Sequence, residues 1–246
     1  MTPTSECILV FLRAPDRGKV KKRLARALGD DAALALYRCF VADLLAVVAE
    51  SGRPAWLCYT PPGGRERIKD WLGDTLPMLP QQGGDLGRRM AHAFRTAFFR
   101  GVGRALLVGT DIPDLPRTHI AQAFAGLDSR SSVIGPTLDG GYYLIGFRSD
   151  GFAESVFDGI PWGTDRVMAE TLAAFERENR TPLLLESWPD IDRRRDLAAF
   201  MARQGKTPWA APATSAFLAE RFPGGLPAEP KRPVGQKAPA GAGEID

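Results

Sequence analysis

Hydrophobic residues follow two different patterns along the chain. Residues 7–13 form an almost unbroken apolar run, which is typical of a β-strand that is covered on both faces. Residues 30–50 instead place apolar side chains three or four positions apart, as on one face of a helix. The beginning of the chain therefore predicts a buried strand followed by a long helix.

This alternation of strand-like and helix-like segments continues to about residue 203. Further strands are expected at 54–60, 76–80, 104–110, 131–136, 142–148 and 182–188. Further helices are expected at 20–28, 65–72, 85–100, 116–126, 165–178 and 193–203. Repeated strand–helix–strand units predict an α/β fold with three layers (α/β/α) and a mostly parallel sheet. In such sheets ligands bind outside the carboxyl ends of the strands, so we expect functional residues in the loops there.

The composition favours one large domain. The chain has 246 residues, of which 44% are hydrophobic and 25% are charged, as is ordinary for a globular protein. We expect residues 1–222 to form a single domain. Residues 223–246 are rich in Pro, Gly and Ala and contain no aromatic residue, so we expect a disordered tail there.

The sequence carries no signal for export or membrane insertion. No apolar run approaches the roughly 20 residues that a membrane span needs, and the first six residues lack the basic start of a signal peptide. The three cysteines, at positions 7, 39 and 58, form no CxxC pair, and there are only two histidines. These features predict a cytoplasmic protein with reduced cysteines and without a His-rich metal site.

The net charge of +3 is distributed unevenly. Residues 13–26 carry seven basic residues and one acid, a local charge of +6, so the rest of the chain has 3 − 6 = −3. A basic segment between a strand and the start of a helix predicts a site for a compact anion such as phosphate. The segment contains no aromatic residue on which bases could stack, which argues against nucleic-acid binding. A solvated basic helix without a ligand is the alternative.

A helical wheel distinguishes the charges within this segment. If the apolar residues at positions 20, 24, 27 and 28 form a buried stripe, Lys21 and Arg23 border that stripe and Lys22 points away from it. Lys21 and Arg23 are therefore predicted to reach a phosphate. Lys22 is predicted to be a solvated surface charge.

An acidic turn follows the predicted strand at 104–110. Asp111 comes directly after the strand, and its carboxylate is a hard oxygen ligand suited to Mg²⁺ or Mn²⁺. A simple turn-forming role is the alternative for this residue. Asp114 is expected to cap the next helix, with Pro116 in its first turn.

Three further turns at strand ends carry acidic or glycine residues. In segment 135–144, Asp139 lies at the lip of the sheet, and Gly140 and Gly141 would let backbone approach a ligand closely; a plain hairpin is the alternative. A Gly-rich turn at 80–90 leads into a helix capped by Asp85. Residues 188–197 again place acids after a strand. Together these turns and the basic segment predict a site for a nucleoside di- or triphosphate with a divalent cation.

In combination the turns resemble the motifs of a bacterial family of GT-A-type glycosyltransferases with the Rossmann-like nucleotide-diphospho-sugar transferase fold. The resemblance covers roughly residues 7–203. It lies in elements of the form Lys-x-Pro-x-x-Gly-x-x-Lys-Thr-Arg-Leu, Gln-x-Gly-Asp-Leu-Gly-x-Arg, Gly-Ser-Asp-x-Pro, Asp-Gly-Gly-Tyr, Trp-x-Thr and Asp-x-Asp-x-x-x-Asp-Leu. Members of this family have been linked to arsenosugar biosynthesis. More distant similarity extends to molybdenum-cofactor guanylyltransferase and 2-phospholactate guanylyltransferase.

The resemblance implies a role for each matching residue. Nucleotide and phosphate binding is implied for Arg13, Gly18, Lys21, Arg23, Asp85, Leu86, Gly87 and Arg89. A place on the substrate side is implied for Asp139, Gly140, Gly141, Tyr142, Trp162 and Thr164, and metal binding for Asp111 and Asp192. Two positions depart from the family pattern. Arg13 replaces the first Lys, and Lys22 replaces a Thr whose hydroxyl could contact phosphate or cap the helix.

The implied activity is glycosyl transfer from a nucleotide-diphospho-sugar donor to a small-molecule acceptor, with Mg²⁺ or Mn²⁺ as cofactor. In that reaction Lys21 and Arg23 would stabilise the leaving diphosphate, and Asp139 could take the proton of the acceptor hydroxyl if the reaction inverts configuration. The sequence leaves both inversion and retention open. Two alternatives are open. One is nucleotidyl transfer from a nucleoside triphosphate to a small phosphorylated substrate, and the other is a nucleotide-binding module with little catalytic activity.

Overall fold

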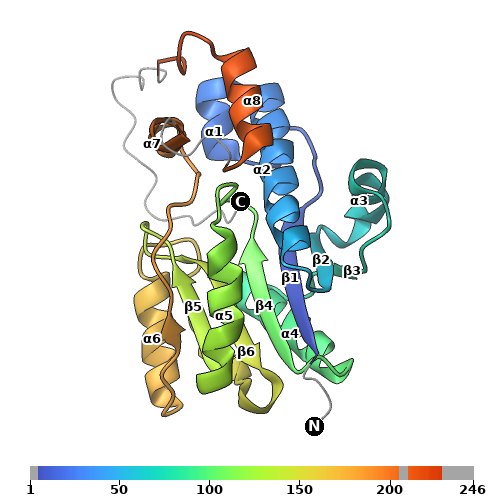
Figure 1. Cartoon of the computed structure of the whole chain (residues 1–246), viewed down its shortest axis with the longest axis vertical. Coiled ribbons are helices and arrows are strands. Elements are labelled where there is room, and N and C mark those ends of the chain that lie inside the picture. Colours follow the sequence, from blue (N-terminus) through green and yellow to red (C-terminus); the bar gives the residue numbers. More distant parts are fainter. Residues whose placement is uncertain (1–4, 205–209, 229–246) are drawn as a thin grey trace.

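The computed structural model describes residues 5–204 and 210–228 and contains one seven-stranded sheet (Figure 1). The strands are β1 (Glu6–Arg13), β2 (Ala55–Thr60), β3 (Met78–Pro80), β4 (Arg104–Gly109), β5 (Ser132–Pro136), β6 (Tyr142–Arg148) and β7 (Leu183–Leu184). Their order in the sheet is β3-β2-β1-β4-β6-β5-β7. Strand β6 runs antiparallel to both of its neighbours, and the other pairs are parallel. The predicted mostly parallel sheet is confirmed.

Helices cover both faces of this sheet. They are α1 (Lys22–Leu28), α2 (Asp30–Glu50), α3 (Arg65–Leu72), α4 (Leu86–Phe99), α5 (Arg117–Ser129), α6 (Val167–Arg177), α7 (Arg194–Gln204) and α8 (Pro212–Arg221). Three short 3₁₀ helices lie at η1 (Pro62–Gly64), η2 (Ser149–Gly151) and η3 (Glu154–Phe157). Helices α4 and α6 pack on one face of the sheet, and α2, α3 and α5 pack on the other. The three-layer α/β/α arrangement is therefore confirmed.

Strand β1 shows why an unbroken apolar run is needed between two helical layers. Successive side chains of a strand point to opposite faces. Leu9 and Phe11 accordingly belong to the cluster under α4, whereas Val10 and Leu12 belong to the cluster under α2 and α5. Because β1 lies inside the sheet, between β2 and β4, it needs apolar residues on both faces.

A third apolar cluster lies beyond the carboxyl ends of the strands, where α1, α7 and α8 meet the first half of α2 (Figure 1). Its centre contains Phe40 of α2 and Phe200 of α7, both fully buried. Helix α8 was not predicted from the sequence. Its first turn is stabilised from a distance, because the buried Asp43 carboxylate of α2 accepts hydrogen bonds from the N–H groups of Ala213 and Thr214. A cap that comes from 170 residues away leaves no local signal.

Helix α2 is, within the residues that the structure describes, the one helix long and apolar enough to cross a membrane by length and composition. Arg38 and Asp43 interrupt its apolar residues, so α2 is not an unbroken apolar run of the roughly 20 residues that a membrane span needs. Half of the most apolar stretch of α2 is buried inside the domain. Leu36 and Phe40 pack in the third cluster, while Leu44 and Val48 pack against the sheet. These contacts account for the apolar composition of α2 as that of a core helix.

Two other boundaries differ from the sequence prediction. The extended segment expected at 182–188 contains only the short strand β7 and one isolated bridge between Thr137 and Trp188. Of the predicted tail, residues 229–246 lie outside the described part of the chain. Residues 223–228 are described, and there Leu226 packs on the third cluster and accepts a hydrogen bond from the Arg194 guanidinium at 3.1 Å.

Candidate functional site

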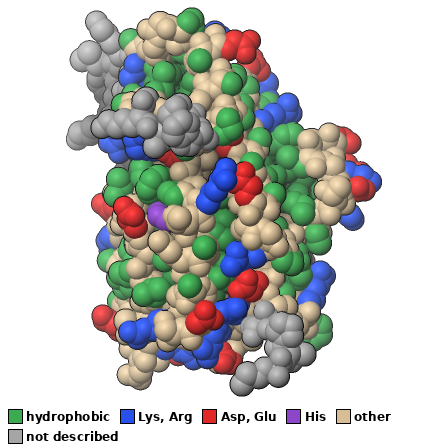
Figure 2. All heavy atoms as spheres, viewed as in Figure 1, with side chains coloured by type: hydrophobic (Ala, Val, Ile, Leu, Met, Phe, Trp, Pro, Cys, Tyr) green, Lys and Arg blue, Asp and Glu red, His purple; other side chains and the backbone are tan. Residues whose placement is uncertain are grey.

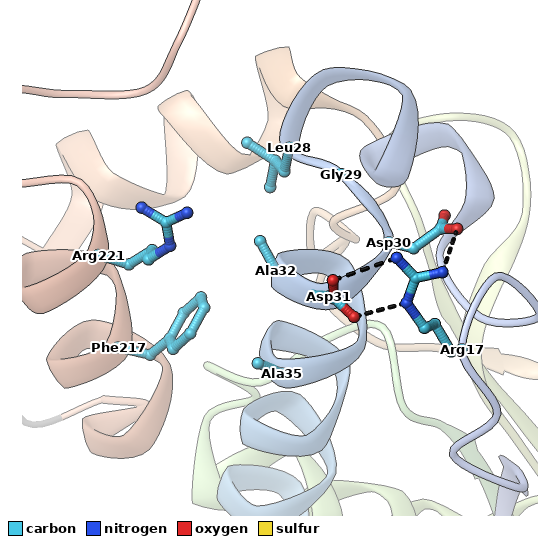
Figure 3. A pocket seen from close by; sticks show the side chains of 9 residues that line it. All are labelled: Arg17, Leu28, Gly29, Asp30, Asp31, Ala32, Ala35, Phe217 and Arg221. Carbon is cyan, nitrogen blue, oxygen red and sulfur yellow. Dashed lines mark hydrogen bonds and ion pairs between the residues drawn. The ribbon is translucent and has the colours of Figure 1, made fainter.

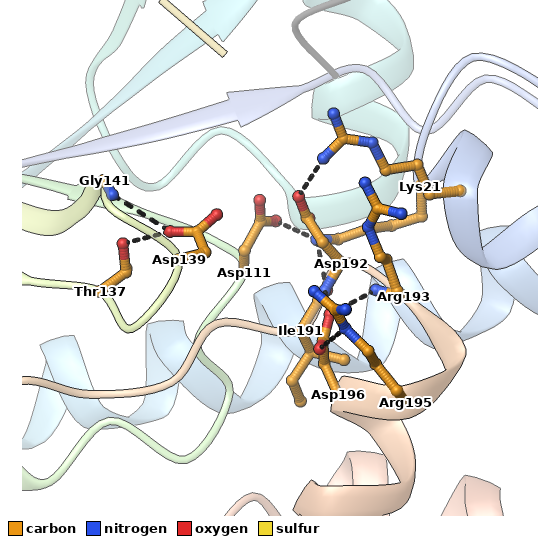
Figure 4. A network of polar contacts seen from close by, with 11 residues as sticks. Lys21, Asp111, Thr137, Asp139, Gly141, Ile191, Asp192, Arg193, Arg195 and Asp196 are labelled. Carbon is orange, nitrogen blue, oxygen red and sulfur yellow. Dashed lines mark hydrogen bonds and ion pairs between the residues drawn. The ribbon is translucent and has the colours of Figure 1, made fainter. Parts of the chain in front are cut away.

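The carboxyl edge of the sheet gathers charged residues from loops that are far apart in the sequence (Figure 4). Two backbone hydrogen bonds fasten these loops together. The Ile191 N–H donates to the carbonyl of Asp111 at 2.8 Å, and the Trp188 N–H donates to the carbonyl of Pro136 at 3.0 Å. The loop after β4 and the loop before α7 are thereby held side by side. Asp111 and Asp192 consequently lie next to each other, as the metal-site prediction requires.

Lys21 lies between these two carboxylates. Its side chain is 3% exposed, and its Nζ lies 2.7 Å from Asp111 Oδ1 and 2.9 Å from Asp192 Oδ1. It also donates to the carbonyl of Ile191 at 2.7 Å, so all three N–H donors of the ammonium have a partner. Burial alone would lower the pKa of Lys21, but the charges of Asp111 and Asp192 outweigh burial and raise it. The lysine is therefore a buried cation held by two aspartates.

Arg23 contacts the same cluster from the first turn of α1. Its Nη1 lies 3.1 Å from Asp192 Oδ2, and its side chain is 32% exposed. The charge of Lys21, followed by that of Arg23, lowers the pKa of Asp192 despite its burial. Asp192 is itself oriented by the start of α7, because Asp196 Oδ2 accepts hydrogen bonds from the N–H groups of Asp192 and Arg193. This bonding explains why an acid recurs four residues after Asp192.

Two more carboxylates face this centre. Asp139 lies in the loop between β5 and β6, where its Oδ1 accepts hydrogen bonds from Thr137 Oγ1 at 2.6 Å and from the Gly141 N–H at 3.1 Å. Asp190 precedes Asp192 by two residues. Burial, followed by the charges of Asp139, Asp192 and Asp111, raises the pKa of Asp190 to about 7. Sequence reasoning noted the acids at 188–197 but did not select Asp190, although the Asp-x-Asp spacing was visible.

These residues fit a divalent cation of one particular kind. Asp111 and Asp192 each direct one oxygen at the same positive group, the Lys21 ammonium. Burial first, and then the charges of three neighbouring carboxylates, raises the pKa of Asp190 at the same edge. Within residues 5–204 and 210–228, however, no group of three or more His, Cys, Asp or Glu side chains is arranged to hold a metal. The site therefore fits Mg²⁺ or Mn²⁺ bound by two carboxylates with water and ligand phosphates, not an all-protein cage.

The helical wheel drawn for residues 20–28 was wrong at its beginning. Lys21 has a left-handed backbone conformation (φ 45°) and precedes α1, so it is not part of the helix. Val20 packs with Tyr37 and Val41 in a separate small cluster. Lys22 is half-buried and is not a fully solvated charge. Lys21 reaches the site because of the turn before α1, which the helical periodicity could not show.

The other two residues expected in the first phosphate element support the loop before α1. The Arg13 N–H donates to the hydroxyl of Tyr37 at 2.8 Å, and that hydroxyl donates back to the Arg13 carbonyl at 2.9 Å. Gly18 has φ 70°, a value that side-chain-bearing residues rarely adopt, and a Cβ there would lie 3.3 Å from Asp30. The tight turn thus explains the glycine without a ligand.

The Gly-rich turn at 83–89 follows β3, which is separated from β1 by β2. Asp85 caps α4 as predicted, because its Oδ1 accepts a hydrogen bond from the Arg88 N–H at 2.8 Å. Arg89 closes the turn by donating to the carbonyl of Gly83 at 3.2 Å. Leu86 packs against the cluster under α4. These hydrogen bonds of Asp85 and Arg89 are with residues of the turn and of α4 itself.

The segment from Trp162 to Asp165 packs against two of the predicted glycines, Gly87 and Gly140. A Cβ on Gly87 would lie 2.7 Å from the Trp162 ring, and a Cβ on Gly140 would lie 2.1 Å from the Asp165 carbonyl oxygen. The close approach at Gly140 is therefore to the chain itself. Tyr142 packs edge-on against Trp162 with ring centroids 6.3 Å apart, and burial raises the pKa of its hydroxyl.

Thr164, the last residue of the Trp-x-Thr element, shapes the same turn. Its Oγ1 donates to the Pro161 carbonyl at 2.8 Å and accepts a hydrogen bond from the Arg166 N–H at 3.3 Å. The Thr164 side chain is exposed. Its contacts therefore explain the residue as a turn former that leads into α6.

Asp114 does not cap α5, contrary to prediction. The helix begins at Arg117 after Pro116, and no side chain caps it. The Asp114 side chain is only 3% exposed, and it accepts hydrogen bonds from Trp188 Nε1 at 3.2 Å and from Arg203 Nη2 at 3.0 Å. Asp114 thus joins the loop after β4 to the loop before α7 and to α7 itself. A helix cap can be predicted from local sequence spacing. The contacts that Asp114 makes instead are with residues 74 and 89 positions away, which local spacing does not show.

A cavity of about 350 Å³ lies away from this cluster, between the α1–α2 junction and α8 (Figure 3). Leu28, Ala32, Ala35 and Phe217 supply its apolar walls. Its charged rim is largely paired, because Arg17 bonds to Asp31 at 2.6 Å and lies 3.6 Å from Asp30. None of the predicted site residues lines this cavity.

Comparison with known proteins agrees with this fold. A family profile described as "Uncharacterized protein conserved in bacteria (DUF2064)" matches residues 43–164. A crystal structure of a "putative nucleotide-diphospho-sugar transferase" from Desulfovibrio desulfuricans G20 is 41% identical, with a TM-score of 0.84 over 88% of this chain and 94% of that one. The chain therefore belongs to the same family as this Desulfovibrio protein.

Asp111 and Asp139 lie within the segment that the family profile matches, whereas Lys21, Arg23 and Asp192 lie outside it. More distant structures share the fold alone. CMP:2-keto-3-deoxy-manno-octonic acid synthetase complexed with CTP is 10% identical, with a TM-score of 0.51 over 82% of this chain and 99% of that one. The 4-diphosphocytidyl-2C-methyl-D-erythritol synthase of Anaerococcus prevotii is 11% identical, with a TM-score of 0.55 and the same coverage. No curated protein matched the sequence. The predicted nucleotide-diphospho-sugar transferase fold is confirmed.

Proposed function

We propose that this protein is a glycosyltransferase that takes a nucleotide-diphospho-sugar donor and uses Mg²⁺ or Mn²⁺. One observation carries the proposal: Asp111 and Asp192, from loops 81 residues apart, each direct an oxygen at one cationic position on the carboxyl edge of the sheet. The 41% identical relative, which is named after nucleotide-diphospho-sugar transfer, supports the choice of donor.

The residues of the cluster divide the chemistry among them. Asp111 and Asp192 would hold the metal, which when bound neutralises charge on the donor diphosphate. Arg23 is partly exposed and borders Asp192, so its guanidinium can bind the same diphosphate and stabilise it as it leaves. An acceptor oxygen forms the new bond to the sugar carbon as the bond from that carbon to the diphosphate oxygen breaks.

The proton of the acceptor hydroxyl needs a base on the sheet edge. Asp139 lies in the loop between β5 and β6, and its Oδ1 is fixed by Thr137 and the Gly141 N–H. Its side chain is exposed, so an acceptor can reach it from solvent. We assign Asp139 as the group that takes this proton. The nucleoside diphosphate then leaves with the electrons of the broken bond.

The experiment has two stages. A thermal-shift screen with common nucleotide sugars, with and without Mn²⁺, identifies the donor, since a ligand at 100 times its dissociation constant stabilises a fold by about 2.7 kcal/mol. The best donor is then incubated with a panel of small hydroxylated acceptors while free nucleoside diphosphate is measured. We expect Mn²⁺-dependent release of nucleoside diphosphate. Release of pyrophosphate from a nucleoside triphosphate with a sugar phosphate would instead establish nucleotidyl transfer.

A further inference from the structure

The position of Lys21 is unusual for a phosphate-binding lysine. Its backbone has φ 45° and ψ 45°, a left-handed conformation that residues other than glycine rarely adopt. Such a conformation persists where the surrounding contacts determine it, and here the side chain is almost fully buried against two carboxylates. The loop before α1 is thus shaped to insert this ammonium into the cluster (Figure 4).

The ammonium lies in the position that a shared cation would need. Its Nζ is 2.7 Å from one oxygen of Asp111 and 2.9 Å from one oxygen of Asp192. The carbonyl of Ile191 accepts its third hydrogen bond, so no N–H of Lys21 remains for a phosphate in this arrangement. A divalent cation and an ammonium cannot share one such position, because like charges this close repel strongly in a partly buried site.

We propose that Lys21 is a built-in competitor of the metal. It holds Asp111 and Asp192 together in the metal-free protein, and the metal binds to them by exchange with its ammonium. This inference rests on the proposed function in that the displaced ammonium would then meet the donor diphosphate. Asp192 keeps a positive partner throughout, since Arg23 binds its other oxygen at 3.1 Å. As a consequence, the metal binds weakly in the absence of donor, and metal and donor each increase the affinity for the other.

The test measures Mn²⁺ binding to the full chain without nucleotide, by the electron paramagnetic resonance signal of free Mn²⁺. Lys21→Met removes the charge and keeps much of the side-chain volume. We expect its Mn²⁺ affinity to exceed that of the wild type by at least about tenfold, because two carboxylates lose their cation. Arg26→Met is the matched control, because Arg26 is an exposed cation of the helix that follows Lys21, and it should change the affinity by less than about twofold.

A double variant identifies the ligands. Adding Asp111→Asn to Lys21→Met should return Mn²⁺ affinity to the wild-type level or below. A folded Lys21→Met protein that binds Mn²⁺ no more tightly than wild type overturns the inference. If wild type then still binds Mn²⁺ in the presence of its donor, the proposed function survives that result. If neither protein binds Mn²⁺ under any of these conditions, both the inference and the metal-dependent function fail.

A measurement on the wild type covers the case in which Lys21→Met does not fold. Buried, ion-paired lysines react slowly with acetylating reagents, and mass spectrometry can follow each lysine separately. Saturating Mg²⁺ should increase the rate of Lys21 acetylation several-fold, because exchange frees the ammonium. The rate at Lys19, an exposed lysine before the same helix, should not change. Bound Mg²⁺ with unchanged Lys21 reactivity would contradict the exchange.

Discussion

The two ends of the sheet carry charged clusters that differ in balance. At the amino end, Glu6 of β1 binds Arg53 at 2.6 Å and Arg104 at 2.8 Å, and Arg104 also bonds to Asp128 of α5. This cluster contains two acids and two bases. At the carboxyl end, Lys21 and Arg23 bind Asp111 and Asp192, and the charge of Asp139 also acts on a fourth carboxyl group, that of Asp190.

The balanced cluster is explained by the fold alone. Glu6 and Arg104 are paired residues of neighbouring strands, and the Arg53 guanidinium lies over the Phe124 ring at 4.6 Å. Such contacts join the beginnings of β1, β2 and β4 and neutralise one another. Elsewhere, on the face shown in Figure 2, acidic and basic side chains are likewise interspersed. Excess charge of one sign, held where strands end, is what distinguishes the candidate site.

The largest expected effect follows from removing one charge at each end of the sheet. Asp111→Asn should fold normally and lose at least about 100-fold in metal-dependent donor affinity, because the metal loses one of two protein ligands. Asp128→Asn makes the same chemical change at the amino end and should leave donor affinity within about twofold. Calorimetry with Mn²⁺ and the donor measures both. Equal losses in the two variants would remove the distinction between the clusters.

The sequence predicted some residues of the carboxyl end better than others. Apolar runs such as residues 7–13 depend on local burial, so the strands and most helices could be placed. Asp111 could also be placed, because a residue directly after a buried parallel strand must lie at the carboxyl edge. By contrast, the pKa of Asp190 is raised by burial and by the charges of Asp139 and Asp111. These residues lie near Asp190 only because β4, β6 and β5 are neighbours in the sheet.

Lys21 shows the same limit in a single side chain. Helical periodicity placed it on the flank of a helix, reaching outward to a phosphate. Its left-handed backbone conformation instead puts it before α1, and its carboxylate partners lie 90 and 171 residues further along the chain. Local spacing identified the residue but could not supply its partners.

A smaller effect is expected from the two arginines of α1. Arg23→Ala should weaken donor binding by about tenfold, because a charged hydrogen bond contributes roughly 1.5–3 kcal/mol. Arg26→Ala removes the same charge from an exposed position one turn further along the helix and should cost less than about threefold. Donor titrations at physiological salt separate the two. Similar losses would mean that residues 13–26 act as a diffuse basic surface and not through a defined contact.

The burial of Asp190 beside other carboxylates should also appear in the pH dependence of stability. The pKa of Asp190 is about 7 in the folded protein against 3.8 for the ordinary side chain, so the folded state binds its proton more tightly. Its contribution to stability is therefore present at low pH and is lost as the pH rises toward 7. Between pH 5 and pH 8, wild type should lose about 2–3 kcal/mol relative to Asp190→Asn, which cannot ionise.

Thermal and denaturant unfolding in the presence of a chelator measure this difference. The lowered pKa values of His92 and His119 act in both proteins, so they cancel when the variant is compared with wild type. A constant difference between wild type and Asp190→Asn across this range would show that burial and the neighbouring carboxylates do not raise the pKa of Asp190.

The smallest effect on the site is expected from the amino-end cluster, and it is a change in stability alone. Glu6→Gln keeps the shape of the side chain but removes the charge that two arginines share, which should cost about 1 kcal/mol at low salt. Strand β1 has eight residues, or about 26 Å at 3.3 Å each, which far exceeds the Debye length of about 8 Å at physiological salt. Mn²⁺ and donor affinities of Glu6→Gln should therefore equal those of wild type within about twofold. A larger change in either affinity would mean that the two ends of the sheet are coupled through the strands and that charge balance alone does not separate scaffold from site.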